Sequence, residues 1–290
     1  MSRTMGQTNT RGGVVVTGAS TGIGEATALR LATMGYTVFG GVRRDEDGRR
    51  LVEESDGRVR PVRLEVTDAV EIAAAKETVT EVLAGERLAG LVNNAGIALA
   101  SPLEFVPLDL LRRQLEVNTV APVAVSQAFL PMLRSSRGRI VHIGSNSGLV
   151  SAPFFGPYCA SKFALEALST AMRMELRRWG IEVSIVDPGD IDTPIWGKSQ
   201  ALADEVLASM PPEADALYGW AVPRIRAAAE GSARAGIPAD EVAKVVVVAL
   251  TARRPRARYM VGRDAKVQAA ASRVLPQRTM ERLILQHLKI

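Results

Sequence analysis

Cysteine and histidine are scarce in this chain of 290 residues. Cys159 is the only cysteine, so no disulfide can form within the chain, as is typical of proteins in a reducing cytoplasm. The two histidines, His142 and His287, lie far apart, and no group of Cys, His, Asp and Glu has the spacing of metal ligands. We therefore expect a cytoplasmic protein without a metal site, in which Cys159 is a small packed residue and His142 a hydrogen-bonded structural one.

Long apolar runs and strong charge of one sign are also absent. No run reaches the ~18 residues of a membrane span, and residues 1–12 lack the apolar core of a signal peptide, so they predict a disordered tail. The net charge is +5, and one late stretch gathers six basic residues: Arg253, Arg254, Arg256, Arg258, Arg263 and Lys266. No nucleic-acid reader motif accompanies them, so we expect a solvated face, no nucleic-acid partner and no membrane.

A glycine-rich turn follows the first apolar run. Gly13–Thr17 has the β-branched composition of a buried parallel strand, and the apolar residues after Glu25 mark a helix that stops at Gly35. Between them stands Gly18-Ala19-Ser20-Thr21-Gly22-Ile23-Gly24. A strand, a glycine turn and a helix N-terminus together suit a pyrophosphate, because bare backbone permits close approach and the helix end presents unpaired N–H groups.

The second expected strand, Tyr36–Val42, ends at Arg43 and Arg44. In such a unit this point meets the adenosine ribose of the cofactor. Two arginines there suit the 2′-phosphate of NADP(H) through charge-assisted contacts, whereas a carboxylate would select NAD(H). We therefore predict NADP(H) as the preferred cofactor, with NAD(H) as the alternative. The other interpretation is that both arginines merely begin a charged loop through Arg50.

Apolar β-like runs alternate with helical patterns along the rest of the chain. Further strands are expected at Arg58–Glu65, Leu88–Val92, Arg139–Ile143, Ile181–Val186 and Tyr259–Gly262. This alternation predicts an α/β fold, one doubly wound parallel sheet of about seven strands with helices on both faces. The glycine loop, Asn93–Gly96, Ser145 and Pro188-Gly189 all follow strands, so they should meet at the sheet edge where such folds bind ligands.

A long helix is expected over Leu108–Leu133. Pro122 should kink it, because proline lacks the N–H that would bond the carbonyl of Asn118. Asn118 is itself a poor interior helix residue, so it indicates either this distortion or a polar contact.

Tyr158 and Lys162 stand four residues apart in another helical pattern, so their side chains share one face. A nearby ammonium favours phenolate and lowers the pKa of a tyrosine, which prepares it to exchange protons near neutral pH. The alternative is a chance pair on one helix. The convergence of Ser145 and the ligand-binding loops on the same sheet edge favours the catalytic interpretation.

The chain resembles the short-chain dehydrogenase/reductase family over nearly its whole length, in motifs that keep the family's order: Thr17-Gly-x-x-x-Gly22-x-Gly24, Asn93-Asn94-Ala95-Gly96, Asn118, Ser145, Tyr158-x-x-x-Lys162 and Pro188-Gly189. The resemblance implies a single-domain Rossmann fold, an NAD(P)-dependent enzyme, and assembly into homodimers or homotetramers through the two long helices. It implies a catalytic tetrad of Asn118, Ser145, Tyr158 and Lys162. It also implies a cofactor site made of Gly18, Ser20, Thr21, Gly22, Ile23, Gly24, Arg43, Arg44, Glu65, Val66, Asn94, Ala95, Gly96, Tyr158, Lys162, Pro188, Gly189, Ile191 and Thr193.

Two positions depart from the family pattern. Thr21 stands where NADP-dependent members often carry a basic residue, and Glu65 stands where an aspartate near the adenine is usual. Within the family, Pro157–Ala164 and the run Pro153-Phe154-Phe155 look like the hydroxysteroid and retinol dehydrogenases. That likeness suggests a steroid-, retinoid- or aliphatic-like substrate, by analogy only.

Residues 194–236 depart from the rhythm of the fold, with apolar residues spaced for short helices. In this architecture the segment covers the active site, so it is the candidate substrate lid of a domain spanning residues 13–262. Phe154, Phe155 and Trp196 are candidate substrate contacts and favour a hydrophobic alcohol or carbonyl compound. The alternative is that these apolar residues pack on the sheet or on a partner subunit. Residues 263–290 predict a helical extension whose apolar stripe docks on protein rather than on a membrane.

The sequence therefore predicts an oxidoreductase that transfers a hydride between NADP(H) and a hydrophobic alcohol or ketone. Tyr158 would be the general acid/base, Ser145 would bond the substrate oxygen, and Lys162 would hold the nicotinamide ribose. One alternative is a nicotinamide-nucleotide-sensing binding or regulatory protein of the same fold without turnover, which the complete tetrad disfavours. Another is a peripheral membrane protein that uses the basic stretch and the apolar tail.

Overall fold

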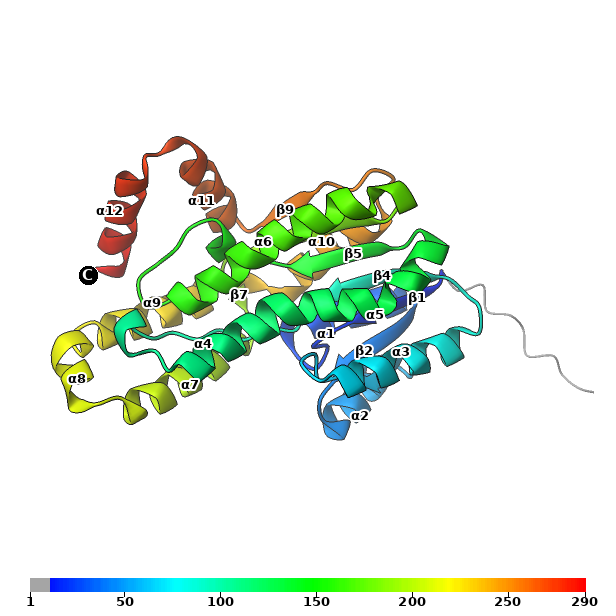
Figure 1. The fold of residues 1–290 in the computed structure, drawn as a ribbon, viewed down its shortest axis with the longest axis horizontal. Helices are drawn as coiled ribbons and strands as arrows, with labels where there is room; N and C mark the ends of the chain where they lie inside the picture. The colour runs from blue at the N-terminus through cyan, green and yellow to red at the C-terminus, as the bar shows by residue number, and fades with distance from the viewer. Residues whose placement is uncertain (1–10) are drawn as a thin grey trace, which may run out of the picture.

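Seven parallel strands form the centre of the molecule (Figure 1). The computed structural model describes residues 11–290, so residues 1–10 of the expected tail lie outside the described residues. The strand order is β3-β2-β1-β4-β5-β6-β9, and every neighbouring pair is parallel. The strands are β1 (Gly13–Val16), β2 (Thr37–Val42), β3 (Val59–Arg63), β4 (Leu88–Asn93), β5 (Arg139–Ile143), β6 (Glu182–Pro188) and β9 (Arg258–Val261). The predicted doubly wound sheet is confirmed.

Helices cover both faces of the sheet (Figure 1). One face carries α1 (Gly22–Thr33), α2 (Asp45–Glu54) and α10 (Ala239–Thr251). The other carries α3 (Ala69–Leu83), α5 (Ala121–Ser136) and α6 (Gly156–Leu176). Val14 and Val16 pack in the first layer while Val15 packs in the second, because successive side chains of a strand point to opposite faces. The β-branched runs of the sequence are therefore strands buried on both sides.

A local distortion divides the long helix that the sequence predicts over Leu108–Leu133. The structure has α4 (Leu108–Leu115), a π turn (Glu116–Val120) and then α5. Pro122 lies in the first turn of α5, where a missing N–H is tolerated. The expected kink is thus a π turn around Asn118, a feature often found at functional sites.

Two other details differ from the sequence analysis. The charged-loop interpretation of the residues after Arg44 is wrong from Asp45 onward, because these residues form α2 and bury Leu51. A short parallel pair, β7 (Ile191–Asp192) and β8 (Ile237–Pro238), was not predicted. Three short 3₁₀ turns complete the connections: Leu103–Phe105, Asn146–Gly148 and Arg177–Trp179.

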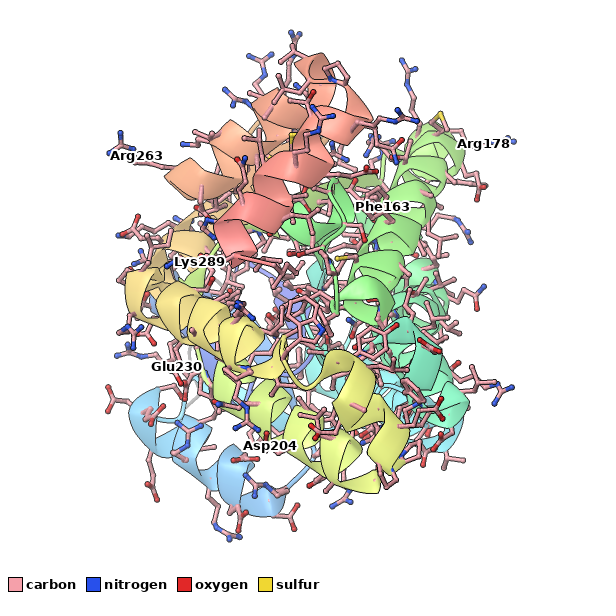
Figure 2. All side chains as sticks on the ribbon, turned by 90° about the vertical axis from the view of Figure 1, so that its left-hand side faces the viewer. Phe163, Arg178, Asp204, Glu230, Arg263 and Lys289 are labelled. Carbon is pink, nitrogen blue, oxygen red and sulfur yellow. The ribbon has the colours of Figure 1, made fainter. Side chains whose placement is uncertain are left out.

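Five helices gather at one end of the molecule, on the left of Figure 1 and facing the viewer in Figure 2. They are α7 (Ile195–Ser209), α8 (Pro212–Tyr218), α9 (Val222–Ala235), α11 (Arg263–Val274) and α12 (Gln277–Leu288). The helices expected in residues 194–236 are present, and α12 packs against α9 and α11. None of the helices in residues 11–290 is long and apolar enough to cross a membrane.

Candidate active site

The glycine loop between β1 and α1 is tied to the end of β4. The Thr17 hydroxyl accepts the backbone N–H groups of Asn94 and Ala95 at 2.9 and 3.0 Å. The Asn94 amide donates in return to the carbonyls of Thr17 and Gly18, both at 3.0 Å. Asn94 therefore fixes the path of the glycine loop. The sequence pattern alone does not indicate this role, because asparagine and glycine after a strand are also ordinary turn residues.

Glycine is required in this loop for contact as well as for conformation. Gly18 and Gly22 have φ of +61° and +62°, values that side-chain-bearing residues rarely adopt. A Cβ on Gly18 would lie 2.9 Å from the Cα of Ala95, and one on Gly22 would lie 3.1 Å from the Thr193 side chain. A Cβ on Gly24 would clash with the Gly18 carbonyl and the Asn94 amide. The bare backbone at the start of α1 thus forms a cradle that fits the diphosphate of a dinucleotide.

A cavity of about 710 Å³ extends from this cradle along the carboxyl ends of the strands. Its size suits a cofactor with a small substrate. Most residues expected at the cofactor line it: Gly18, Ser20, Thr21, Gly22, Ile23, Arg43, Glu65, Val66, Asn94, Ala95, Gly96, Tyr158, Lys162, Pro188, Gly189, Ile191 and Thr193. Gly24 and Arg44 do not line it, because Gly24 packs behind the loop and Arg44 turns to Glu46 and Asp47.

The two arginines after β2, Arg43 and Arg44, differ in their surroundings. Arg43 lines the cavity, and its guanidinium lies 3.6 Å from the Glu65 carboxylate. Arg44 instead pairs with Asp47 at 3.1 Å, on the first turn of α2. Lys198, on α7, reaches across to the Thr21 hydroxyl at 3.4 Å. A cation from the lid segment therefore stands beside the position where the sequence lacked a basic residue.

Three of the four expected catalytic side chains line the same cavity: Ser145, Tyr158 and Lys162. Ser145 is buried after β5; its hydroxyl donates to the side-chain oxygen of Asn146 and accepts the Ser147 N–H, both at 3.1 Å, and it interacts with the Tyr158 hydroxyl. Lys162 lies one turn after Tyr158 on α6; its ammonium donates to the Ile143 carbonyl at 2.9 Å and lies 5.8 Å from the centroid of the Tyr158 ring. Together, the Ser145 and Tyr158 hydroxyls can donate hydrogen bonds to a carbonyl oxygen, and one of them can exchange a proton with it.

The protonation of Tyr158 differs from the expectation. Burial raises the pKa of Tyr158 to about 12, and its hydrogen bond with Ser145 opposes the rise. Burial also lowers the pKa of Lys162 to about 8, which the carboxylates of Asp187 and Glu166 oppose. The Tyr158 phenol is therefore protonated and uncharged at neutral pH. Desolvation raises its pKa by more than the acidifying effect that was expected from Lys162.

Asn118 lies outside the cavity lining and is fully buried. Its side-chain oxygen accepts the Ile97 N–H at 2.9 Å, and its amide donates to the Ile97 carbonyl at 2.9 Å and to the Ser161 hydroxyl at 3.0 Å. The side chain thus connects the loop after β4 to α6. It supports Tyr158 and Lys162 from behind rather than pointing at a ligand.

The three candidate substrate residues separate. Phe155 and Trp196 line the cavity, whereas Phe154 does not. Phe154 has a φ of +68°, and its ring packs edge-on against Tyr218 of α8, with centroids 6.1 Å apart. The Trp196 ring is fixed by a hydrogen bond from its N–H to the Ile191 carbonyl at 2.8 Å. Phe154 therefore packs against α8, whereas Phe155 and Trp196 line the cavity.

Several cavity residues were not found from the sequence. They come from α4 and the π turn (Arg112, Arg113, Glu116, Val117), from α7 and α9 (Lys198, Ser199, Ala228, Ala229, Ser232) and from α12 (His287, Leu288). Helical spacing before Asn118 could have indicated the first group. His287 and Leu288 reach the cavity only because the C-terminal helix folds back, which no local pattern predicts.

His142 behaves as the sequence indicates. It is buried in β5, and its Nδ1 lies 3.2 Å from the side-chain amide of Asn93. Burial lowers the pKa of His142 to about 4, with the Lys162 charge adding to the effect, so the ring is neutral at neutral pH.

Comparison with known proteins adds independent information. The family model described as short chain dehydrogenase matches residues 13–203. An NADPH-dependent 3-dehydrocapnine reductase from Ornithobacterium rhinotracheale is 34% identical over 280 residues, covering 95% of this chain and 96% of that protein. Retinol dehydrogenase 5 from Mus musculus is 34% identical over 277 residues, covering 93% and 87%.

Solved structures show the same fold. A short-chain dehydrogenase from Streptomyces avermitilis superposes with a TM-score of 0.75 at 26% identity, covering 97% of each chain. A short chain dehydrogenase from Burkholderia cenocepacia in complex with NADP superposes with a TM-score of 0.72 at 25% identity, covering 96% of this chain and 99% of that one. The similarity therefore extends over the lid segment and the C-terminal helices as well as the sheet.

Proposed function

The chain belongs to the short-chain dehydrogenase family, and from that premise we propose that it transfers a hydride between NADP(H) and a hydrophobic alcohol or ketone, with Tyr158 as general acid/base. The observation that carries the proposal is that Ser145, Tyr158 and Lys162 line one cavity with the glycine loop. The catalytic interpretation accounts for that convergence better than a binding protein without turnover, which has no need of a buried proton donor beside a ligand site.

NADP(H) is the proposed preferred cofactor, with NAD(H) as the alternative. The loop of Gly18–Gly24 would hold the diphosphate, Arg43 the 2′-phosphate, Lys162 the nicotinamide ribose, and Thr193 the carboxamide. Arg43 at the end of β2 supports this choice, as does the NADPH dependence of the 3-dehydrocapnine reductase. The bound nicotinamide supplies or accepts the hydride.

The protein's own residues would move the proton. Ser145 donates a hydrogen bond to the substrate oxygen, and the Tyr158 hydroxyl gives its proton to that oxygen as a carbonyl is reduced. A phenol whose pKa burial raises to about 12 starts this step in the required protonated state. The Lys162 ammonium, one helical turn away, stabilises the phenolate that forms.

The apolar part of the cavity supports a hydrophobic substrate. Phe155, Ile195, Trp196 and Leu288 line it, from the loop before α6, from α7 and from α12. Retinol dehydrogenase 5 and the 3-dehydrocapnine reductase, both similar over most of this chain, have names that fit an alcohol or a carbonyl substrate. Residues 194–236 would act as the lid that excludes water from it.

We also propose a homodimer or homotetramer in the cytoplasm. The outer face of α6 exposes three large apolar side chains, Phe163, Leu168 and Met174, of which Figure 2 labels Phe163. Exposed apolar side chains on a long helix suit contact with a second copy of the chain. The single free cysteine supports the reducing compartment.

The central experiment measures oxidation of NADPH and NADH against a panel of ketones, aldehydes, retinal and steroids. Tyr158→Phe should lower turnover at least ~10³-fold while the NADPH dissociation constant stays within about twofold, because only the proton donor is lost. Tyr36→Phe is the matched control, since Tyr36 lies before β2 and outside the cavity lining. Wild-type turnover by Tyr158→Phe would refute the assignment.

A further inference from the structure

A buried aspartate stands directly behind the catalytic side chains. Asp187 is the penultimate residue of β6, before Pro188 and Gly189, and is fully buried. Its Oδ1 accepts the backbone N–H of Ser145 at 3.1 Å. The position is made by Gly144, where a Cβ would clash with that same oxygen. Sequence patterns give Asp187 only the role of a turn residue before Pro-Gly.

The other oxygen of Asp187 belongs to a buried group of charges. Its Oδ2 lies 3.2 Å from Nε of Arg258, at the start of β9, but accepts no hydrogen bond from the described residues. The Arg258 guanidinium also pairs with Glu166 of α6, one turn after Lys162. Arg258 therefore does not belong to the solvated basic face expected from the sequence. Three elements, α6, β6 and β9, contribute two carboxylates and two cations.

These charges depend on one another because water is excluded. Burial raises the pKa of Asp187 to about 8, and Glu166 adds to the rise while Arg258 and Lys162 oppose it. For Lys162, burial favours the neutral amine, and the carboxylates of Asp187 and Glu166 favour the ammonium. Removing one carboxylate would leave Lys162 with less compensation for its desolvation.

We propose that Asp187 is a positioning residue for the reaction: it holds the backbone at Ser145 and, when it is ionised, favours the ammonium form of Lys162 beside Tyr158. This proposal rests on the proposed function, in which Lys162 acts as an ammonium. Asp187 touches neither the substrate nor the cofactor in this role. It acts through Ser145 on one side and through the charge of Lys162 on the other.

Asp187→Asn separates the two effects. Its side-chain carbonyl can still accept the Ser145 N–H, but it carries no charge, so the Lys162 ammonium should be lost about one pH unit lower than in the wild type. Asp187→Ala removes the acceptor as well and should lower kcat at every pH. Glu182→Gln, on the exposed start of β6, is the matched control without effect.

The test uses the full chain and a readout that needs no turnover. The NADPH dissociation constant is measured between pH 7 and pH 10, where the 2′-phosphate is about 90% or more in its doubly charged form. Weakening of NADPH binding should begin about one pH unit lower in Asp187→Asn than in the wild type, and the fall of kcat/KM for ketone reduction should move by the same amount. Superimposable profiles for folded Asp187→Asn and wild type would overturn the proposal.

Two further outcomes are distinguishable. If the wild type binds NADPH but reduces no ketone, the proposed function fails while the binding profiles still test Asp187. If Asp187→Asn does not fold, as judged by its thermal transition, Asp187→Ser decides, because it also removes the charge: a binding profile shifted to lower pH supports the charge coupling, and an unshifted one refutes it.

Discussion

Replacing Arg43 by alanine should remove most of the preference for NADP(H). The Arg43 side chain is 63% exposed and lies 3.6 Å from the Glu65 carboxylate, which competes with a 2′-phosphate for the guanidinium. A hydrogen bond to a charged group contributes about 1.5–3 kcal/mol. Because Arg43 is exposed and a carboxylate competes for it, we expect its contribution to NADPH binding to lie at the lower end of this range, about 1.5–2 kcal/mol. Losing that contribution corresponds to a ~10–30-fold higher NADPH dissociation constant for Arg43→Ala than for the wild type.

The assay is a pair of titrations, with NADPH and with NADH, followed by quenching of tryptophan fluorescence. Arg43→Ala should raise the dissociation constant of NADPH by that factor. It should change the dissociation constant of NADH by less than about twofold, because NADH has no 2′-phosphate. Glu65→Gln should act in the opposite direction and tighten NADPH a few fold, since it frees the guanidinium and removes a repelling charge.

Arg44→Ala is the matched control. Arg44 is adjacent in sequence and carries the same charge, but it pairs with Glu46 and Asp47, each at 3.1 Å, and lies outside the cavity lining. Its removal should leave both dissociation constants within about twofold of the wild type. If Arg43→Ala keeps the NADPH to NADH ratio of the wild type, or if Arg44→Ala lowers that ratio as much, the reasoning from the structure is refuted.

Two other predictions concern stability and assembly. The pKa of His142 falls from 6.5 to about 4 on folding, so the unfolded chain binds this proton more tightly and stability is lost as the pH falls below about 6.5. The free energy of unfolding in urea should lose about 2 kcal/mol between pH 8 and pH 5 through this group. Subtracting the same profile of His142→Asn isolates the effect, and a difference independent of pH would contradict it. Phe163→Glu, on the exposed face of α6, should shift the oligomer toward monomer in light scattering after gel filtration, whereas Glu182→Gln should not.

Most of the central fold could be predicted because its signals are local. The β-branched runs around Val15 and Ile140 alternate with helical patterns, and parallel strands must be buried on both faces. The start of α3 is also fixed locally, because the Asp68 carboxylate accepts the N–H groups of Val70 and Glu71 at 2.8 and 3.2 Å. The helix α2 was missed because it is highly charged and buries little beyond Leu51.

The same distinction between local and long-range signals applies to the residues that line the cavity. Gly22, Tyr158 and Ser145 could be identified because their motifs specify a local conformation or a fixed spacing along the chain. Lys198 and His287 could not, because they reach the cavity through the return of α7 and α12, which depends on packing over long sequence separations. Phe154 was misplaced for a related reason: its positive φ and its contact with Tyr218 turn the ring away from the cavity.

The protonation of the site shows why spacing alone could not settle its electrostatics. The spacing of four residues from Tyr158 to Lys162 establishes that the two side chains share a face of the helix, but the pKa of each depends on how much water the fold excludes. In the structure, burial moves both pKa values toward the neutral forms, to about 12 for Tyr158 and about 8 for Lys162. The carboxylates of Asp187 and Glu166, when ionised, favour the ammonium form of Lys162. The protonation of Tyr158 and Lys162 thus depends on groups from two packed elements, α6 and β6, rather than on one helical turn.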